Sequence, residues 1–458
     1  MKKMDIINPA TEEVIASVLQ DNRTSLDTKY SKLVAGQITW KQVGLEKRID
    51  VINKFSHLLS EHIEILAKTL TDEVGKPLQQ SRNEINGAKA RIKWLTDNAS
   101  KYLADEVMQQ SAGLTELIRY EPLGVICNIS AWNYPYLVGT NVFVPALLAG
   151  NAVMYKPSEF STLTGQHIIR LLKEAGVPED VIEIAIGGAE TGQSLLEMPF
   201  DGYFFTGSYK TGKHIYETVA PKMVICQCEL GGKDPVYIAN DIVDIKSVAA
   251  GTADGAFYNN GQSCCSVERI YVHADIYDAY VDEFVKEVQS WKIGDPNEEG
   301  VYIGPLSRKS QLSYLENQVQ DALKKVGTLL VGGKRIDRKG YYFEPTVLIN
   351  VTHEMQVMKE ESFGPIIGIM KVENDEQALK LMKDTAYGLT ASVYSSSQSR
   401  AEKILNEIDA GSGYWNCCDR VSAALPWSGR KHSGFGATLS HVGLRAFTKS
   451  KGMHLRIV

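Results

Sequence analysis

The sequence predicts an α/β protein with two domains built on parallel sheets, the first of them doubly wound, and a small β extension. From residue 123 to residue 230, short apolar segments alternate with helical patterns, which is typical of a parallel sheet covered by helices on both faces. A second alternating block runs from residue 245 to residue 383. The length of 458 residues favours two to three domains at roughly 150 residues each.

The predicted elements begin with a helical layer at residues 45–110, where apolar side chains such as Ile52, Phe55 and Leu59 recur at helical spacing. The first block contains predicted strands at 123–130, 152–156, 181–186, 202–206 and 224–230, and predicted helices at 142–149, 162–174 and after 208. The second block contains predicted helices at 245–257, 276–292 and 376–383, and predicted strands at 269–273, 328–331, 346–349 and 366–371. We expect loops at 411–413 and 429–436, where glycine recurs.

Residues 114–121 alternate apolar and polar side chains and interrupt the first block. Together with residues 452–458, we expect them to form a sheet at the edge of the molecule. Exposed strand edges are usually paired. Pairing between subunits is one way to cover this edge.

The composition excludes several classes of protein. Hydrophobic residues make up 44% of the chain and charged residues 23%, as in an ordinary globular protein. The net charge is −6 and basic residues are interleaved with acidic ones, so we expect no nucleic-acid partner. The most apolar stretch, residues 142–150, is shorter than the ~20 residues of a membrane span. The N-terminus has no apolar signal segment, so we expect a cytoplasmic protein.

The seven cysteines form no Cys-x-x-Cys pair, so we expect no zinc site and no other metal. Their odd number and the adjacent pairs favour reduced thiols over disulfides. Cys264 stands apart because it follows the glycine-containing turn Asn259–Gln262 at the end of a predicted helix. A loop at this place makes a nucleophile reachable, although a cysteine after such a turn is more often structural.

Two further polar side chains come directly after predicted strands. Glu229 ends the fifth strand of the first block and precedes two glycines, so its carboxylate is placed to act as a general base, with a structural ion pair as the alternative. Asn133 follows the first strand. Its amide can donate to an oxyanion, although an asparagine before Tyr-Pro also suits a plain turn.

Two other strand ends suit a nucleotide. Lys156 and Glu159 flank Pro157-Ser158 after the second strand, and a carboxylate there accepts from a ribose 2′-hydroxyl and repels a 2′-phosphate. Residues 206–212 (Thr-Gly-Ser-Tyr-Lys-Thr-Gly) lie between the fourth strand and a helix. Helix N-termini of this kind bind phosphate through backbone N–H groups, but as a motif the segment is weak.

Taken together, these segments resemble the aldehyde dehydrogenase superfamily. Eight motifs occur in the family's order over almost the whole chain: Asn-Pro-Ala-Thr (8–11), Ala-Trp-Asn-Tyr-Pro (131–135), Lys-Pro-Ser-Glu (156–159), Thr-Gly-Ser (206–208), Glu-Leu-Gly-Gly-Lys (229–233), Gly-Gln-Ser-Cys (261–264), Glu-Ser-Phe-Gly-Pro (361–365) and Pro-Trp-Ser-Gly (426–429). Any one of them arises easily by chance, whereas the ordered set is specific.

The resemblance implies NAD(P)-dependent oxidation of an aldehyde to a carboxylic acid through a thiohemiacetal and a thioester. It implies that Cys264, not Cys265, is the nucleophile, that Asn133 and the Cys264 N–H hold the oxyanion, and that Glu229 activates water. It implies cofactor contacts at Trp132, Lys156, Ser158, Glu159, Gly207, Ser208, Thr211, Glu361 and Phe363. Among these, Glu159 favours NAD, with NADP still possible.

The resemblance also implies a domain division. A Rossmann-like NAD-binding domain would comprise residues 1–105 and 124–231, and a catalytic domain residues 232–445. Residues 106–123 and 446–458 would form the oligomerisation strands of a homodimer or homotetramer. Glu229 favours hydrolysis of the thioester over transfer to coenzyme A. A coenzyme-A-acylating enzyme and a non-catalytic structural family member are the alternatives.

The substrate is less well defined by sequence. Tyr134, Tyr258 and Trp427 match the family's substrate tunnel, and an aromatic pair can bind a quaternary ammonium such as betaine aldehyde. Asn141 stands where a tunnel aromatic is often found, so a generic hydrophobic tunnel is the preferred interpretation. Arg420, near the expected tunnel mouth, would favour semialdehyde acids, but a salt bridge to Asp419 or another carboxylate is the plainer expectation.

Overall fold

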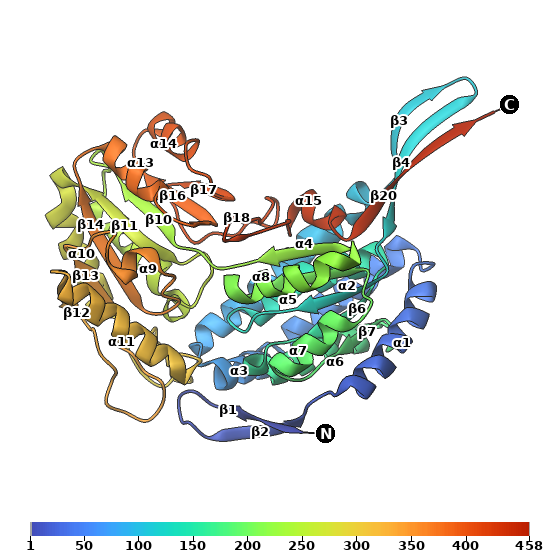
Figure 1. Ribbon diagram of the computed structural model, residues 1–458, viewed down its shortest axis with the longest axis horizontal. Helices are drawn as coiled ribbons and strands as arrows, with labels where there is room; N and C mark the ends of the chain where they lie inside the picture. Colours follow the sequence, from blue (N-terminus) through green and yellow to red (C-terminus); the bar gives the residue numbers. More distant parts are fainter. Residues whose placement is uncertain (1, 458) are drawn as a thin grey trace.

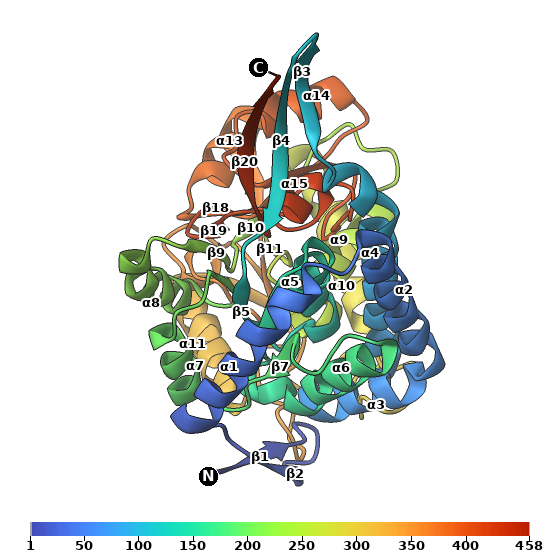
Figure 2. The same ribbon diagram turned by 90° about the vertical axis from the view of Figure 1, so that its right-hand side faces the viewer.

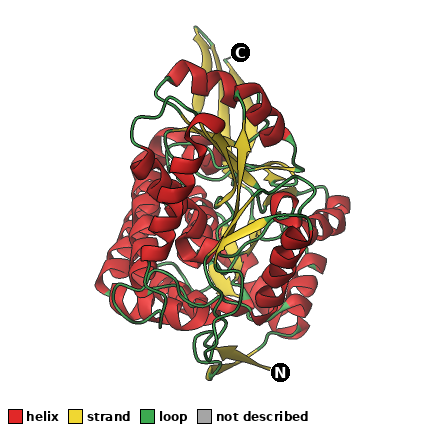
Figure 3. Cartoon of the chain, turned by 90° about the vertical axis from the view of Figure 1, so that its left-hand side faces the viewer, coloured by secondary structure: helices red, strands yellow, loops and turns green. Residues whose placement is uncertain are grey.

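The computed structural model describes residues 2–457. Two large sheets, each flanked by helices, lie beside each other, and a three-stranded sheet projects from one end (Figure 1). Helices lie on both sides of the strands (Figure 3). This architecture confirms the predicted α/β class with its β extension.

The first large sheet has six strands in the order β19-β9-β8-β5-β6-β7. Its members are β5 (Val125–Ile129), β6 (Ala152–Lys156), β7 (Ile182–Ile184), β8 (Gly202–Thr206), β9 (Ile225–Glu229) and β19 (Gly434–Phe435). All pair in parallel except β19, which is antiparallel to β9. The strand order reverses between β5 and β8, and open parallel sheets bind ligands at such a switch point.

The helices around this sheet are α1 (Arg23–Trp40), α2 (Leu45–Glu61), α3 (Ile63–Val74), α4 (Leu78–Tyr102), α5 (Pro135–Ala149), α6 (Thr162–Ala175), α7 (Ala189–Glu197), α8 (Tyr209–Val219) and α15 (Ser440–Arg445). The predicted helical layer ends at Tyr102 rather than at residue 110, because residues 106–111 form a strand. Helix α5 is apolar on all sides and almost entirely buried, since it packs against both α2 and α4. A hairpin of β1 (Lys3–Ile7) and β2 (Val14–Leu19) precedes α1.

The second large sheet has seven strands in the order β12-β13-β14-β11-β10-β16-β17. They are β10 (Asp234–Ile238), β11 (Val267–His273), β12 (Thr328–Val331), β13 (Thr346–Ile349), β14 (Ile366–Val372), β16 (Thr390–Tyr394) and β17 (Ser412–Trp415). Only the edge strand β12 is antiparallel to its neighbour. The surrounding helices are α9 (Ile245–Phe257), α10 (Tyr277–Ser290), α11 (Lys309–Lys324), α12 (Gln356–Lys359), α13 (Asp375–Lys383) and α14 (Gln398–Leu405).

Two glycine-rich stretches that we expected to be loops contain strands. Residues 412 and 413 belong to β17, where Gly413 pairs with Ala391 of β16. Within 429–436, β18 (Arg430–Lys431) pairs with β15 (Tyr387–Gly388), and β19 extends the first sheet. The loop predictions were wrong here because pairing with a distant strand outweighs the local preference of glycine for turns.

The projecting sheet consists of β3 (Glu106–Ser111), β4 (Leu114–Pro122) and β20 (Thr448–Arg456), in the order β20-β4-β3 (Figure 2). The antiparallel register runs from Thr448 opposite Pro122 to Arg456 opposite Leu114. This pairing confirms the expected edge sheet. Met1 and Val458, at the ends of the predicted ranges, lie outside the described residues.

Between residues 2 and 457, no helix is both long and apolar enough to cross a membrane. Within the same range, no group of three or more His, Cys, Asp or Glu side chains could hold a metal ion.

Candidate active site

Two cavities meet inside the molecule. The first has a volume of about 930 Å³ and lies against α4, α5 and the start of α9. The second has a volume of about 1030 Å³ and is lined by the segments that follow β5, β6, β8 and β9, at the carboxyl ends of the first sheet. Thr206, Glu229 and Cys264 line both cavities. A thiol and a carboxylate therefore stand at the boundary between two ligand-sized spaces.

The loop that carries Cys264 has an unusual backbone. Asn259, Asn260 and Gly261 have φ angles of 54°, 57° and 66°, in the left-handed region. A Cβ at position 261 would lie 2.3 Å from the carbonyl oxygen of Gly364, so only glycine fits there. Consecutive residues in this region store strain that the surroundings must compensate. The tight turn is what brings the thiol from the end of α9 to the meeting point of the cavities.

The two neighbouring thiols have different surroundings. Cys265 is buried and donates its hydrogen to Oδ1 of Asp419 at 3.0 Å. The hydrogen bond with Cys264 and burial raise the pKa of the Cys265 thiol well above its usual value. Cys264 is only half-buried and borders both cavities, whereas Cys265 borders the first alone. Of the pair, Cys264 is the thiol accessible from both sides.

Asn133 is fixed to the cysteine loop. Its side-chain Nδ2 donates to the Gln262 carbonyl at 3.1 Å, and its own carbonyl accepts from Lys76 Nζ at 2.7 Å and from Asn259 Nδ2 at 3.2 Å. Lys76 is fully buried and paired with Glu84 of α4. One Nδ2 hydrogen of Asn133 has no acceptor among residues 2–457, so it remains available to a ligand atom near Cys264.

Glu229 lies at the end of β9 and is half-buried. Burial raises the pKa of its carboxyl group from 4.5 to about 7, while a hydrogen bond donated by the Thr438 hydroxyl and the charge of Arg91 lower it. Thr438 belongs to a segment far away in the sequence, next to Trp427. A carboxyl group with this pKa is half-ionised near neutral pH, which suits proton transfer in either direction.

All nine side chains or backbones expected to contact a cofactor line the second cavity: Trp132, Lys156, Ser158, Glu159, Gly207, Ser208, Thr211, Glu361 and Phe363. The buried Lys156 ammonium donates only to the Pro157 carbonyl, at 3.3 Å, among residues 2–457. Arg308 lies over the Trp132 ring at 5.4 Å, and its buried Nε has no partner in the described chain. Cations with unused donors at a strand switch point fit an anionic dinucleotide.

The N-terminus of α8 also faces this cavity. Ser208 caps the helix, since its hydroxyl accepts from the Thr211 N–H at 3.4 Å. Gly207, Ser208 and Thr211 all line the cavity. The first backbone N–H groups of a helix and its dipole favour a phosphate at such a position.

The loop at residues 361–363 closes the opposite side of the second cavity. Glu361 accepts from the Gly232 N–H at 3.1 Å, and a Cβ at position 231 would lie 2.0 Å from its Oε1. The buried Glu268, paired with Lys233 at 2.6 Å, accepts from the N–H groups of residues 362 and 363. The Phe363 ring then meets Trp132 edge-on at 5.6 Å. A buried ion pair thus holds the loop in place.

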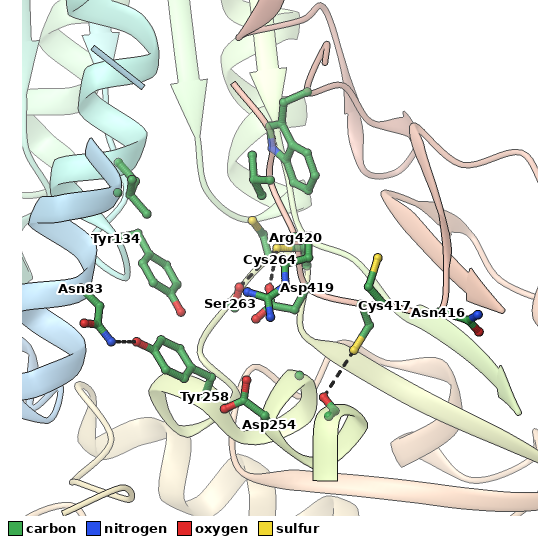
Figure 4. A pocket seen from close by; sticks show the side chains of 18 of the residues that line it. Asn83, Tyr134, Asp254, Tyr258, Ser263, Cys264, Asn416, Cys417, Asp419 and Arg420 are labelled. Carbon is green, nitrogen blue, oxygen red and sulfur yellow. Dashed lines mark hydrogen bonds between the residues drawn. The ribbon is translucent and has the colours of Figure 1, made fainter. Parts of the chain in front are cut away.

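Tyr134, Tyr258, Trp427 and Arg420, expected in the substrate tunnel, all line the first cavity, together with Asn141. Figure 4 shows three of them, Tyr134, Tyr258 and Arg420, around the same pocket as Cys264. Lys76 lies 3.7 Å from the centre of the Tyr134 ring, so one face of this ring already binds a cation of the protein. That contact weakens the case for an aromatic box around a quaternary ammonium.

The salt bridge expected between Arg420 and Asp419 is not formed, and Arg420 makes no ion pair within residues 2–457. Burial and the contact with Cys265 raise the pKa of Asp419 well above its usual value. Asp419 Oδ1 instead accepts from the Cys265 thiol, whereas the Arg420 side chain is exposed, so the predicted pairing was wrong.

Three functional candidates were missed by sequence reasoning: Arg91 in the first cavity, Arg308 in the second, and Thr438 on Glu229. Arg91 lies among other basic residues of a polar helix, and Arg308 and Thr438 lie outside the motifs. Only the tertiary structure brings them to the site.

Comparison with known proteins agrees with this geometry. The profile of the aldehyde dehydrogenase family matches residues 1–453. The chain is 33% identical to the peroxisomal aminoaldehyde dehydrogenase 1 of Pisum sativum, over 98% of this chain and 92% of the relative. It is 32% identical to the chloroplastic betaine aldehyde dehydrogenase of Amaranthus hypochondriacus, over the same shares.

Solved structures give the same result. The fold matches the crystal structure of an NADP-dependent enzyme of E. coli with a TM-score of 0.96, at 28% identity over 100% of this chain and 95% of that chain. It matches the betaine aldehyde dehydrogenase of Staphylococcus aureus in complex with NAD+ with a TM-score of 0.94, at 29% identity over 99% of this chain and 91% of that chain.

Proposed function

The chain belongs to the aldehyde dehydrogenase family and oxidises an aldehyde with NAD(P)+, and on this basis we propose that Cys264, Glu229 and Asn133 perform the chemistry. The observation that carries the proposal is the position of Cys264 and Glu229 on the wall shared by the two cavities. A substrate in the first cavity and a cofactor in the second would meet at these side chains.

Cys264 begins the reaction. Its sulfur bonds to the carbonyl carbon of the aldehyde, and the carbonyl oxygen becomes an oxyanion. The free Nδ2 hydrogen of Asn133 and the backbone N–H of Cys264 donate to this oxygen. Preorganised donors of this kind typically contribute about 2.7–4 kcal/mol each to the rate. NAD(P)+ bound in the second cavity would supply the hydride acceptor, and loss of hydride from this thiohemiacetal would leave a thioester on Cys264.

Glu229 completes the reaction. Its carboxylate takes a proton from water while the water oxygen attacks the thioester carbon. The carbon–sulfur bond breaks, Cys264 leaves as a thiolate, and the carboxylic acid is released. The half-buried position of Glu229 and its pKa of about 7 support this role, because the group is partly ionised at neutral pH.

The cofactor would lie in the second cavity. Lys156 and Ser208 would contact its ribose and phosphate, and Glu361 and Phe363 its nicotinamide half. Glu159 borders this cavity and makes no ion pair within residues 2–457. Its carboxylate would accept from a 2′-hydroxyl and repel a 2′-phosphate, so we propose a preference for NAD over NADP.

The domain division, assembly and location are parts of the same proposal. The cofactor-binding unit would comprise residues 1–105 and 124–231, and the catalytic unit, residues 232–445, would carry the nucleophile. Strand β19 and helix α15 belong to the second range in sequence but pack on the cofactor-binding unit. Exposed apolar side chains on β3, Val107 and Met108, support an interface that makes a homodimer or homotetramer. All seven cysteines are free thiols, which supports the reducing cytoplasm.

The experiment is an assay of NADH formation with a panel of aldehydes in the absence of coenzyme A. The proposed hydrolytic enzyme turns over many times under these conditions. A coenzyme-A-acylating enzyme would need the thiol acceptor for turnover, and a non-catalytic family member would form no NADH with any aldehyde. Either of those results would contradict the proposal.

A further inference from the structure

A cationic side chain that has no direct role in the proposed chemistry lines the first cavity. Helix α4 presents Asn83, Gly87, Ala90 and Arg91 to it, at the spacing of one helix face. The facing wall is α5 with the loop before it. Arg91 reaches towards that wall, because its Nη1 donates to Asn141 Oδ1 at 2.9 Å and to the Leu137 carbonyl at 3.4 Å.

Most donors of Arg91 are unused. A guanidinium group has five N–H donors in a planar fork, and both hydrogen bonds of Arg91 use Nη1 alone. Its Nε–H and the hydrogens of Nη2 have no acceptor within residues 2–457. These two nitrogens form one edge of the fork, which is the geometry that binds a carboxylate through two parallel hydrogen bonds.

Arg91 also has no carboxylate partner in the described chain. Glu229 makes the largest electrostatic contribution to its pKa among the neighbouring charges, but the two groups form no salt bridge. Burial lowers the pKa of Arg91, yet a guanidinium stays charged in proteins. Because the half-buried Arg91 forms no salt bridge within residues 2–457, an anion entering the cavity would gain a direct ion pair with it.

Besides Glu229, three acidic side chains line the cavity, and each accepts a hydrogen bond from a neutral donor. Asp419 accepts from the Cys265 thiol, Asp254 accepts from the Tyr302 hydroxyl at 2.5 Å, and Asp244 caps α9 through the Ser247 N–H. The other cation on the cavity wall, Arg420, is exposed and also lacks an ion pair within residues 2–457. None of these carboxyl groups forms a salt bridge with Arg91 or Arg420 within residues 2–457, so both cations remain available to an anionic group of a substrate.

We propose that Arg91 binds a carboxylate at the far end of the substrate, so that the enzyme oxidises aldehydes of the ω-oxo acid class. This inference rests on the proposed function of Cys264 and Glu229. The free edge of Arg91 recognises the carboxylate while the aldehyde end reaches Cys264, and Tyr134 and Val138 line the space between the helices.

The test compares kcat/KM for succinic and glutaric semialdehyde with kcat/KM for butanal and pentanal, the neutral aldehydes of equal length. We expect the wild type to prefer the acids. In Arg91→Met, kcat/KM for the acid divided by kcat/KM for the neutral aldehyde falls about tenfold to a hundredfold, since a hydrogen bond to a charged group changes a binding constant by this much. In Arg91→Lys, which keeps the charge but loses the planar pair of donors, this ratio lies between those of the wild type and Arg91→Met.

The matched control is Lys93→Met, which removes one positive charge from the solvent face of the same helix, where Lys93 pairs with Asp97. Its ratio stays at the wild-type value. A second measurement does not depend on turnover of the acid: glutarate competes with butanal in the wild type, and its inhibition constant rises in Arg91→Met. Thermal melting of each variant shows that it is folded.

Three results would overturn the proposal. If Arg91→Met lowers kcat/KM equally for acids and neutral aldehydes and moves the pH profile, Arg91 instead supports the charge of Glu229. If the ratio of kcat/KM for acid to kcat/KM for neutral aldehyde falls in Arg420→Gln but not in Arg91→Met, the carboxylate binds at Arg420 instead. If the wild type has equal kcat/KM for acidic and neutral aldehydes, the carboxylate subsite is absent although the proposed function stands. If the wild type oxidises no aldehyde, both proposals fail.

Discussion

At the scale of single residues, burial determines which groups around the two cavities are ionised. The buried Cys265 thiol donates to the half-buried Asp419 carboxyl, and the pKa of each is raised well above its usual value. The pKa of Glu229 is raised only to about 7, because the Thr438 hydroxyl donates to its carboxylate and the charge of Arg91 lies near it. Its neighbours thus keep this one carboxyl group within reach of ionisation at neutral pH.

This balance predicts the pH dependence of hydrolysis. Only ionised Glu229 can accept a proton from water, so the rate of thioester hydrolysis rises as the pH rises through about 7. Thr438→Val removes a donor that stabilises the ionised form, so the pKa rises further and the rate increase moves to higher pH by about one pH unit. Single-turnover hydrolysis of the enzyme-bound thioester, measured across pH, checks this.

Thr438→Ser is the matched control, because it keeps the hydroxyl donor and retains the wild-type profile. A Thr438→Val profile that coincides with the wild type, or that moves to lower pH, would contradict the assigned hydrogen bond.

Sequence reasoning located residues whose position in the chain carries information. Cys264, Glu229 and Asn133 follow strand or helix ends inside recognisable motifs, and the structure places all three around the same boundary. It did not locate Arg91 or Thr438, because their proximity to Glu229 results from the contact of distant segments. Nor could it foresee that Asp419 would accept from the Cys265 thiol instead of pairing with Arg420.

At the scale of elements, the five predicted strands of the first block were found within a few residues. The helix after the 131–135 motif begins at Pro135 rather than at residue 142, and β10, β16 and α11 were not predicted. Strand β17 was not predicted because Gly411 and Gly413 suggest a loop, although its pairing with β16 makes it a strand. The extension was predictable because the alternating segment 114–121 needs a partner, and β20 supplies it.

The extension also predicts assembly. Val107 and Met108 on β3 are 58% and 65% exposed, and the edges of β3 and β20 have no partner strand within residues 2–457. Replacing both side chains with lysine places charges where an interface must be apolar. We expect this variant to sediment as a smaller assembly than the wild type, with a melting temperature close to that of the wild type because exposed substitutions change stability by about 0.5 kcal/mol or less.

The control for assembly is Met223→Lys, since Met223 is 92% exposed and lies in the proposed cofactor-binding unit, outside the extension. It should sediment as the wild type does. A β3 variant with unchanged sedimentation, or a wild type that is already monomeric, would show that the extension does not join subunits.

At the scale of the whole molecule, the active site exists because two cavities of different character share one wall. The first sheet supplies strand ends and a helix N-terminus for the cofactor, and the helices α4 and α5 supply the wall of the substrate space. Alternation of strands and helices predicts each sheet, but not how two sheets are placed against each other. The fold class therefore followed from sequence, whereas the shared wall and the charge of the first cavity required the structure.

The most direct test of the account uses Glu229→Gln, which keeps the side-chain shape and removes the base. When this variant is mixed with aldehyde and NAD+, we expect one burst of NADH equal to the enzyme concentration and no further turnover. Tandem mass spectrometry should then find the acyl group on Cys264 and not on Cys265. Continued turnover at the wild-type rate, or an acyl group on Cys265, would contradict the proposed chemistry.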